Sequence, residues 1–159
     1  MLLVAVQRLI EMRYAARNTA ALRARGAVEI GARHYPLIVV LHAAWLTAIA
    51  ALLPRPVVIH WPLLGAFVIL QLLRVWVIRT LGPYWTTRVI MVPDAPLVRN
   101  GPYRFVRHPN YIVVACEIAV LPLVFGEIWV AIVFSLLNAA MLTWRIRQEE
   151  TTLNPRRQL

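Results

Sequence analysis

Long apolar blocks alternate with short polar stretches that contain proline, glycine and arginine along the whole chain. Five apolar blocks cover residues 1–10, 35–53, 61–78, 111–125 and 128–144. Most of these blocks approach the ~20 residues that an α-helix needs to cross a hydrocarbon layer of roughly 30 Å. The pattern predicts an all-α, polytopic integral membrane protein with about five transmembrane helices.

The first block is short for a span and contains Arg8. Two structures are open for it: a tilted span, or a helix that continues past residue 10 as an amphipathic helix through Glu11, Arg13 and Arg17. No polar stretch of the chain has the length of a soluble domain. We therefore expect a single membrane domain over residues 1–159.

Basic residues are concentrated in three of the polar segments. They are Arg13, Arg17, Arg23, Arg25 and Arg33 in the first, Arg79, Arg88, Arg99, Arg104 and Arg107 in the second, and Arg145, Arg147, Arg156 and Arg157 in the tail. Because cytoplasmic loops of membrane proteins carry an excess of arginine and lysine, these segments should face the cytosol. The other two connections, residues 54–60 and 126–127, hold only Arg55 and should lie outside with the N-terminus. The expected location is the bacterial cytoplasmic membrane.

Composition supports the membrane assignment and removes several function classes. The chain has 159 residues, of which 60% are hydrophobic and 15% charged, whereas soluble domains are about 45–50% apolar and about 25% charged. The net charge is +10, but the basic residues lie between apolar blocks, and no zinc-finger or glycine-aromatic pattern accompanies them. This argues against nucleic-acid binding. Cys116 is the only cysteine, and the four histidines have no ligand spacing, so neither a disulfide nor a metal site is expected.

The longest polar stretch of the second half, residues 80–110, ends in a group of cations, aromatics and turn residues. Pro109 should lie in the first turn of the fourth helix, where free N–H groups and the helix dipole meet Arg107 and His108. An anionic group such as a carboxylate could dock there. Alternatively, the arginines only follow the charge bias, and Tyr103 and Tyr111 belong to an interfacial aromatic belt.

Further polar residues lie within the apolar blocks. Asn138, Arg145 and Glu149 are spaced seven and four residues apart, which places them on one helix face that descends toward the cytosolic loop. The alternative is an ordinary surface pair of Arg145 and Glu149. Arg74 and Glu117 are candidates because burying an unpaired charge in a membrane is costly. Arg74 could instead snorkel to the interface, and Glu117 could pair with a buried arginine or hydroxyl.

The loop and the last block together carry a motif of spaced residues. It reads Gly101-x-Tyr103-x-x-x-Arg107-His108-Pro109-x-Tyr111, then Arg145-x-x-x-Glu149-Glu150-x-x-Leu153. The motif resembles that of the isoprenylcysteine carboxyl methyltransferase family over residues 71–153. The resemblance implies a membrane methyltransferase that binds S-adenosyl-L-methionine from the cytosol. Residues 80–159 would be its catalytic core, and residues 1–79 a variable N-terminal part.

The resemblance also implies roles for individual residues. Cofactor contacts are expected from Leu97, Val98, Tyr103, His108, Pro109, Asn110, Tyr111 and Glu149. Arg145 and Glu149 are the expected catalytic residues. Arg145, Asn138 and Arg74 are expected on the side of the methyl acceptor.

The acceptor should be lipidic, because a helical membrane protein without a soluble domain offers a cleft open to the bilayer. The N-terminal third, including Arg25-Gly26-Ala27 and His34-Tyr35-Pro36, resembles a bacterial branch that methylates phenolic lipids such as alkylpyrones and alkylresorcinols. A prenylcysteine carboxylate is the other candidate acceptor and needs no base. A phenol with a pKa of about 10 must be deprotonated or stabilised as phenolate by Arg145 or a neighbouring group.

Three other functions fit parts of the pattern. A phospholipid N-methyltransferase would have a neutral amine acceptor and little use for Arg145. An NADPH-dependent membrane reductase would bind nucleotide phosphates in place of a methyl donor. A non-catalytic membrane scaffold would need the basic loops only for contact with anionic lipids.

Overall fold

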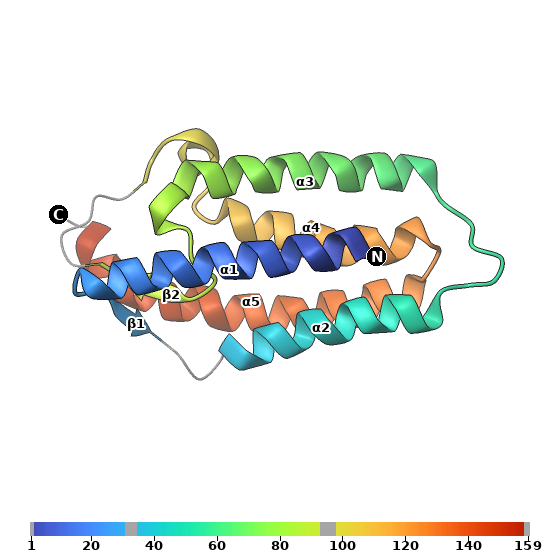
Figure 1. The fold of residues 1–159 in the computed structure, drawn as a ribbon, viewed down its shortest axis with the longest axis horizontal. Helices are drawn as coiled ribbons and strands as arrows, with labels where there is room; N and C mark the ends of the chain where they lie inside the picture. The colour runs from blue at the N-terminus through green and yellow to red at the C-terminus, as the bar shows by residue number, and fades with distance from the viewer. Residues whose placement is uncertain (1, 31–34, 93–97, 158–159) are drawn as a thin grey trace.

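The computed structural model describes residues 2–30, 35–92 and 98–157, with side chains as far as Arg147. Five helices lie side by side along the long axis of this part of the chain (Figure 1). They are α1 (Leu2–Ala24), α2 (Tyr35–Leu52), α3 (Trp61–Leu81), α4 (Pro109–Val124) and α5 (Ile128–Arg157). Two short 3-10 helices, η2 (Gly82–Tyr84) and η3 (Gly101–Arg104), lie in the connection between α3 and α4.

A small sheet is the one departure from the all-α expectation in the described residues. Strands β1 (Val28–Ile30) and β2 (Val89–Met91) pair antiparallel, with Glu29 opposite Ile90. The sheet lies at the same end of the molecule as the C-terminal end of α5, whereas the connections from α2 to α3 and from α4 to α5 lie at the opposite end (Figure 1). The arginine-rich segments therefore gather at one end of the bundle.

Three helical segments are long and apolar enough to cross a membrane: Tyr35–Leu52, Trp61–Tyr84 and Ile128–Arg147. Helix α4 is apolar but has only 16 residues, and α1 carries four charged side chains between Arg8 and Arg17. The prediction of a helical membrane protein is supported, but the count of about five spans is not confirmed. The residues after position 10 continue the first helix, as one of the two predicted structures required, so α1 has 23 residues.

The helices pack through an apolar core and leave apolar side chains on their outer faces. Trp45 and Ile49 of α2 and Ile118 of α4 are almost completely buried in this core. By contrast, Leu72 and Leu136 are 66% and 68% exposed, and many other large apolar side chains are exposed with them. A soluble monomer rarely shows apolar patches of this extent, whereas a lipid environment favours them.

Candidate functional site

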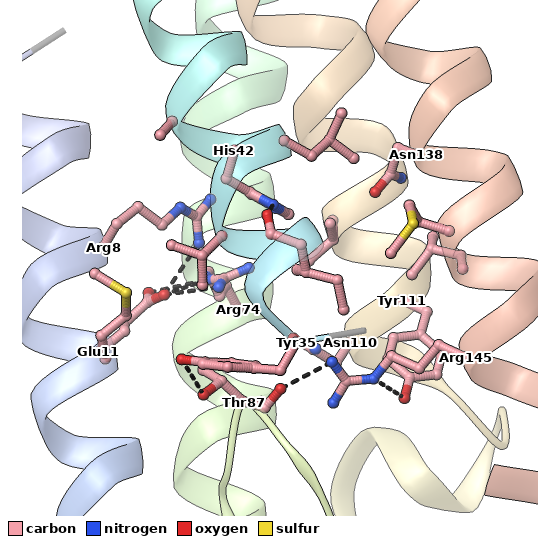
Figure 2. Close-up of a pocket in the computed structure, with 18 of the residues that line it drawn as sticks. Arg8, Glu11, Tyr35, His42, Arg74, Thr87, Asn110, Tyr111, Asn138 and Arg145 are labelled. Carbon is pink, nitrogen blue, oxygen red and sulfur yellow. Dashed lines mark hydrogen bonds and ion pairs between the residues drawn. The ribbon is translucent and has the colours of Figure 1, made fainter. Parts of the chain in front are cut away.

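A cavity of about 330 Å³ opens between the helices. Its walls come mainly from α1, α2 and α5, with contributions from α3, α4 and the segment before β2. Most of the lining is apolar, and the polar side chains occupy two levels (Figure 2). Tyr35, Thr87, Asn110, Tyr111 and Arg145 form the first level. The second, which we call the inner level, comprises His42 and Asn138 at the far end of the cavity and, between them and the first level on the side of α1, Arg8, Glu11 and Arg74.

The first level, which we call the cavity mouth, is organised around Arg145. The Nε of Arg145 donates a hydrogen bond of 2.8 Å to the Tyr111 hydroxyl, and its Nη1 donates one of 2.8 Å to the Thr87 carbonyl oxygen. The guanidinium carbon lies 5.5 Å from the centroid of the Tyr111 ring. None of the carboxylates whose side chains are described pairs with Arg145. Two neutral oxygen acceptors therefore hold the positive charge of Arg145 in place at the cavity mouth.

The N-terminus of α4 lies beside this arginine. His108 is the N-cap residue and makes no side-chain capping bond, and Pro109 occupies the first turn as the sequence predicts. The rings of His108 and Tyr111 are stacked, with centroids 5.2 Å apart and planes 12° apart. The Oδ1 atom of Asn110 is buried and has no hydrogen-bond partner in the described part of the chain. This end of the helix combines a positive dipole, a flat aromatic surface and an unused acceptor atom.

The sheet connects α1 to the cavity mouth. The Glu29 carboxylate on β1 pairs with Arg23 of α1 and with Arg88 beside β2. The Arg88 guanidinium stacks on the Tyr35 ring at 4.1 Å, and the Thr87 hydroxyl donates a 3.2 Å hydrogen bond to the Tyr35 hydroxyl. These contacts fix the position of the Thr87 carbonyl, and through it the position of Arg145.

The inner level contains a buried network of ion pairs. Arg74 donates hydrogen bonds of 2.7 and 2.8 Å to the Glu11 carboxylate and one of 3.0 Å to Glu117. Arg8 donates to the same two carboxylates, at 3.0 Å to Glu11 and 2.7 Å to Glu117. Two positive and two negative charges are thus neutralised within the bundle, as burial requires. The partner predicted for Glu117 is a buried arginine, and the interpretation that Arg74 snorkels to the interface is wrong.

The predicted site residues separate into three groups. Asn110, Tyr111, Asn138, Arg145 and Arg74 all line the cavity. Val98, Tyr103, His108 and Pro109 are described but do not line it, and Tyr103 packs against a cluster of Ala15, Val77 and Trp85. Leu97 and the side chain of Glu149 lie outside the described residues.

Several cavity residues were not identified from the sequence. Arg8 and Glu11 could have been identified, because two opposite charges in or next to an apolar block need partners in a membrane. From the sequence, His42 and Trp45 belong to the N-terminal pattern that resembles the phenolic-lipid branch, but His42 has no assigned role there, and the histidine spacing argues against a metal ligand. Thr87 contributes a backbone carbonyl, which no side-chain pattern can indicate. In the described residues, no three His, Cys, Asp or Glu side chains are grouped so that they could hold a metal ion.

Gly101 of the motif has a steric role in the described structure. Its φ of +54° is a conformation that side-chain-bearing residues rarely adopt, and an added Cβ would lie 2.6 Å from the Thr80 hydroxyl oxygen. The glycine therefore allows η3 to approach α3 closely. This contact positions the chain that leads into the N-terminus of α4.

The chain is similar to two bacterial proteins over most of its length. A Bacillus subtilis (strain 168) protein, "Uncharacterized protein YpbQ", is 40% identical over 152 residues, which cover 93% of this chain and 90% of that protein. A Haemophilus influenzae protein, "Uncharacterized protein", is 27% identical over 143 residues, which cover 87% of this chain and 83% of that protein. No solved structure matches the chain. Neither relative's name refers to phenolic lipids, so the assignment to that branch stays a prediction.

The model of one protein family matches residues 63–155, which include α4, nearly all of α3 and α5, and the connection between α3 and α4. This match contains Arg74, the α4 N-terminus and Arg145, and thus most of the polar residues on that side of the cavity. The chain belongs to the isoprenylcysteine carboxyl methyltransferase (ICMT) family, which indicates a membrane methyltransferase.

Proposed function

We propose that the protein transfers a methyl group from S-adenosyl-L-methionine to an oxygen atom of a lipidic acceptor at the cytosolic membrane interface. The observation that carries this proposal is the apolar cavity whose mouth holds the fixed cation of Arg145 beside the N-terminus of α4. The acceptor would be a phenolic lipid or a prenylcysteine carboxylate.

The residues at the mouth fit the proposed methyl donor. Its carboxylate needs a positive electrostatic environment, and the dipole at the N-terminus of α4 beside Arg145 offers one. The buried Oδ1 of Asn110 can accept a hydrogen bond from an ammonium or ribose hydroxyl. The stacked His108 and Tyr111 rings offer a flat surface for the donor. When bound, the donor supplies a methyl group activated on a sulfonium.

The remaining cofactor assignments follow from the family motif. Val98 and Pro109 precede and begin α4, and Tyr103 holds η3 against the core cluster, so these residues would shape the cofactor site from behind. Leu97 and Glu149 are proposed as cofactor contacts on the resemblance alone. Glu149 would accept a hydrogen bond from the donor.

A lipidic acceptor fits the shape and lining of the cavity. A volume of about 330 Å³ is at the small end of the range for ligand sites, which is about 300–1,000 Å³. It suits a ring or head group, with the alkyl chain passing between helices whose outer faces are already apolar. The arginine-rich end of the bundle would face the cytosol, which would place the cavity mouth near the cytosolic surface of the membrane.

The chain contributes orientation and electrostatics to the reaction. Tyr111 and Thr87 hold Arg145 at the cavity mouth, where its charge can attract and orient a negatively charged group of the donor or of the acceptor. Asn138 and Arg74 line the inner part of the cavity, where they would contact or position the acceptor. Apolar walls exclude water and align the reacting atoms, which supplies much of the rate of such a displacement.

Purified protein in nanodiscs tests this function with radiolabelled methyl donor and two lipid acceptors, an alkylresorcinol and a prenylcysteine. We expect methylation of at least one acceptor, and a loss of about 100-fold in kcat/KM for Arg145→Gln. Arg147→Gln is the matched control, because Arg147 is exposed and two residues away on α5. Methylation of phosphatidylethanolamine with no effect of Arg145→Gln would instead favour the N-methyltransferase, and a requirement for NADPH would favour the reductase.

A further inference from the structure

His42 lies in the cavity wall, two helical turns inward from Tyr35 on α2 (Figure 2). It is the only histidine among the residues that line this cavity. The ion pairs at the inner level do not use it. The proposed function so far gives it no role.

Two contacts fix the orientation and the tautomer of the His42 ring. Nδ1 lies 2.8 Å from the Ile38 carbonyl oxygen, which can only accept a hydrogen bond. In the neutral ring Nδ1 therefore carries the proton, and Nε2 carries a lone pair. The ring packs edge-on against the fully buried Trp45, with centroids 6.4 Å apart and planes 80° apart. Among the described residues, the hydrogen bond of His42 is made through Nδ1 and not through Nε2.

Asn138 occupies the matching level of α5. It is seven residues from Arg145, as His42 is seven residues from Tyr35, so both lie about 10 Å further along their helices than the cavity mouth. Both side chains line the cavity, and Asn138 is only 3% exposed. A hydroxyl at this level can accept a hydrogen bond from the Asn138 amide and donate one to Nε2 of His42.

We propose that His42 is the proton acceptor for a hydroxyl-bearing, phenolic acceptor in this cavity. The inference rests on the proposed methyltransferase function and deepens it, because it selects a phenol over a carboxylate as the acceptor. A carboxylate is already ionised at neutral pH and needs no base. A phenol with a pKa of about 10 is almost entirely protonated, and the permanently charged Arg145 cannot take its proton.

The atoms balance without a further reactant. The bond from the acceptor oxygen to the methyl carbon forms, and the bond from that carbon to the donor sulfur breaks, with its electron pair going to sulfur. The phenolic proton moves to Nε2 of His42 and leaves to solvent after the ether product departs. The sulfonium thus becomes a neutral thioether, and one proton is released for each methyl group transferred.

The charged groups nearest His42 belong to the buried network of the inner level. Arg8 and Arg74 are the cations of the inner level, and each is paired with both Glu11 and Glu117. Because these four charges sum to zero, the network presents no net positive charge to the ring.

The test compares two acceptors of equal chain length, an alkylphenol and its ring-nitrated analogue, whose hydroxyl is ionised at the assay pH. His42→Asn keeps a donor for the Ile38 carbonyl but removes Nε2, and His42→Gln keeps a polar group near Nε2 without its basicity. His60→Asn is the control, because His60 is exposed at the opposite end of the bundle. Binding of the methyl donor by each variant reports whether it is folded.

With the alkylphenol we expect both His42 variants to lose about 100-fold or more in kcat/KM. With the nitrated phenol we expect a loss below about tenfold, because no proton has to be removed. Equal losses with both acceptors would assign His42 a packing role and overturn the proposal, as would full activity of the variants with the alkylphenol. If the wild-type protein methylates only a prenylcysteine carboxylate, the role of His42 as a base is refuted, whereas the methyltransferase function is supported. Wild-type protein that methylates no oxygen would refute both.

Discussion

The buried ion network predicts a large loss of stability when Arg74 loses its charge. Arg74 donates four hydrogen bonds to Glu11 and Glu117, and Glu117 is 1% exposed. Arg74→Met keeps the length of the side chain but leaves two buried carboxylates to share Arg8. Removing one partner of a buried pair typically costs about 3–5 kcal/mol, because the remaining charge is uncompensated.

For a chain of this size, that loss corresponds to a fall of about 6–20 °C in Tm. Thermal unfolding in nanodiscs, followed by the helical circular dichroism signal, measures it. Arg79→Met is the matched control, because Arg79 is exposed five residues further along α3, and its effect should be within about 0.5 kcal/mol.

A double variant separates the loss of charge balance from the loss of packing. Arg74→Met with Glu117→Gln leaves Arg8 and Glu11 as one neutral pair. It should therefore be more stable than Arg74→Met alone, although a carboxylate has been removed as well. The network reasoning fails if Arg74→Met unfolds at the wild-type temperature, or if the double variant is less stable than the single one.

Three further predictions concern separate parts of the molecule. Gly101→Ala should lower stability by about 1–3 kcal/mol in the same unfolding assay, since its φ is +54° and its Cβ would meet Thr80 at 2.6 Å; an unchanged Tm would contradict this role. Tyr111→Phe removes an acceptor from Arg145 and should lower kcat/KM about tenfold, with Tm as the folding control. Burial raises the pKa of the Glu127 carboxyl, which favours its neutral form in the fold. Its contribution to stability is thus complete below the ordinary pKa and lost as pH rises through the raised pKa, so Tm of the wild type relative to Glu127→Gln should fall with rising pH; parallel profiles would exclude this effect.

The helices were largely predictable from the sequence because hydrophobic blocks are local. The blocks that begin at Tyr35, Trp61 and Ile128 start at the same residues as α2, α3 and α5. The length of α1 was ambiguous, because charged residues end a hydrophobic block without ending a helix. Glu11 is tolerated inside the bundle because it pairs with Arg74 of α3 and with Arg8 of α1, and the pairing with Arg74 is visible only in the structure.

The site was predictable where it depends on helix periodicity. Asn138 and Arg145 share a face by their spacing, and both line the cavity. The pairing of Arg145 with Tyr111 joins residues 34 positions apart, and its bond to Thr87 uses a backbone atom. Neither contact has a spacing rule. His42 is a single histidine in an apolar block, and only the cavity distinguishes it from an ordinary packed residue.

Binding of S-adenosyl-L-methionine tests the central claim most directly. Isothermal titration calorimetry on nanodisc-embedded protein should compare the wild type with His108→Ala and Glu149→Ala, after unfolding curves have shown that each variant is folded. The account predicts saturable binding to the wild type and its loss in both variants. Absence of binding to folded wild-type protein would contradict the methyltransferase account and return the reductase and the scaffold to consideration.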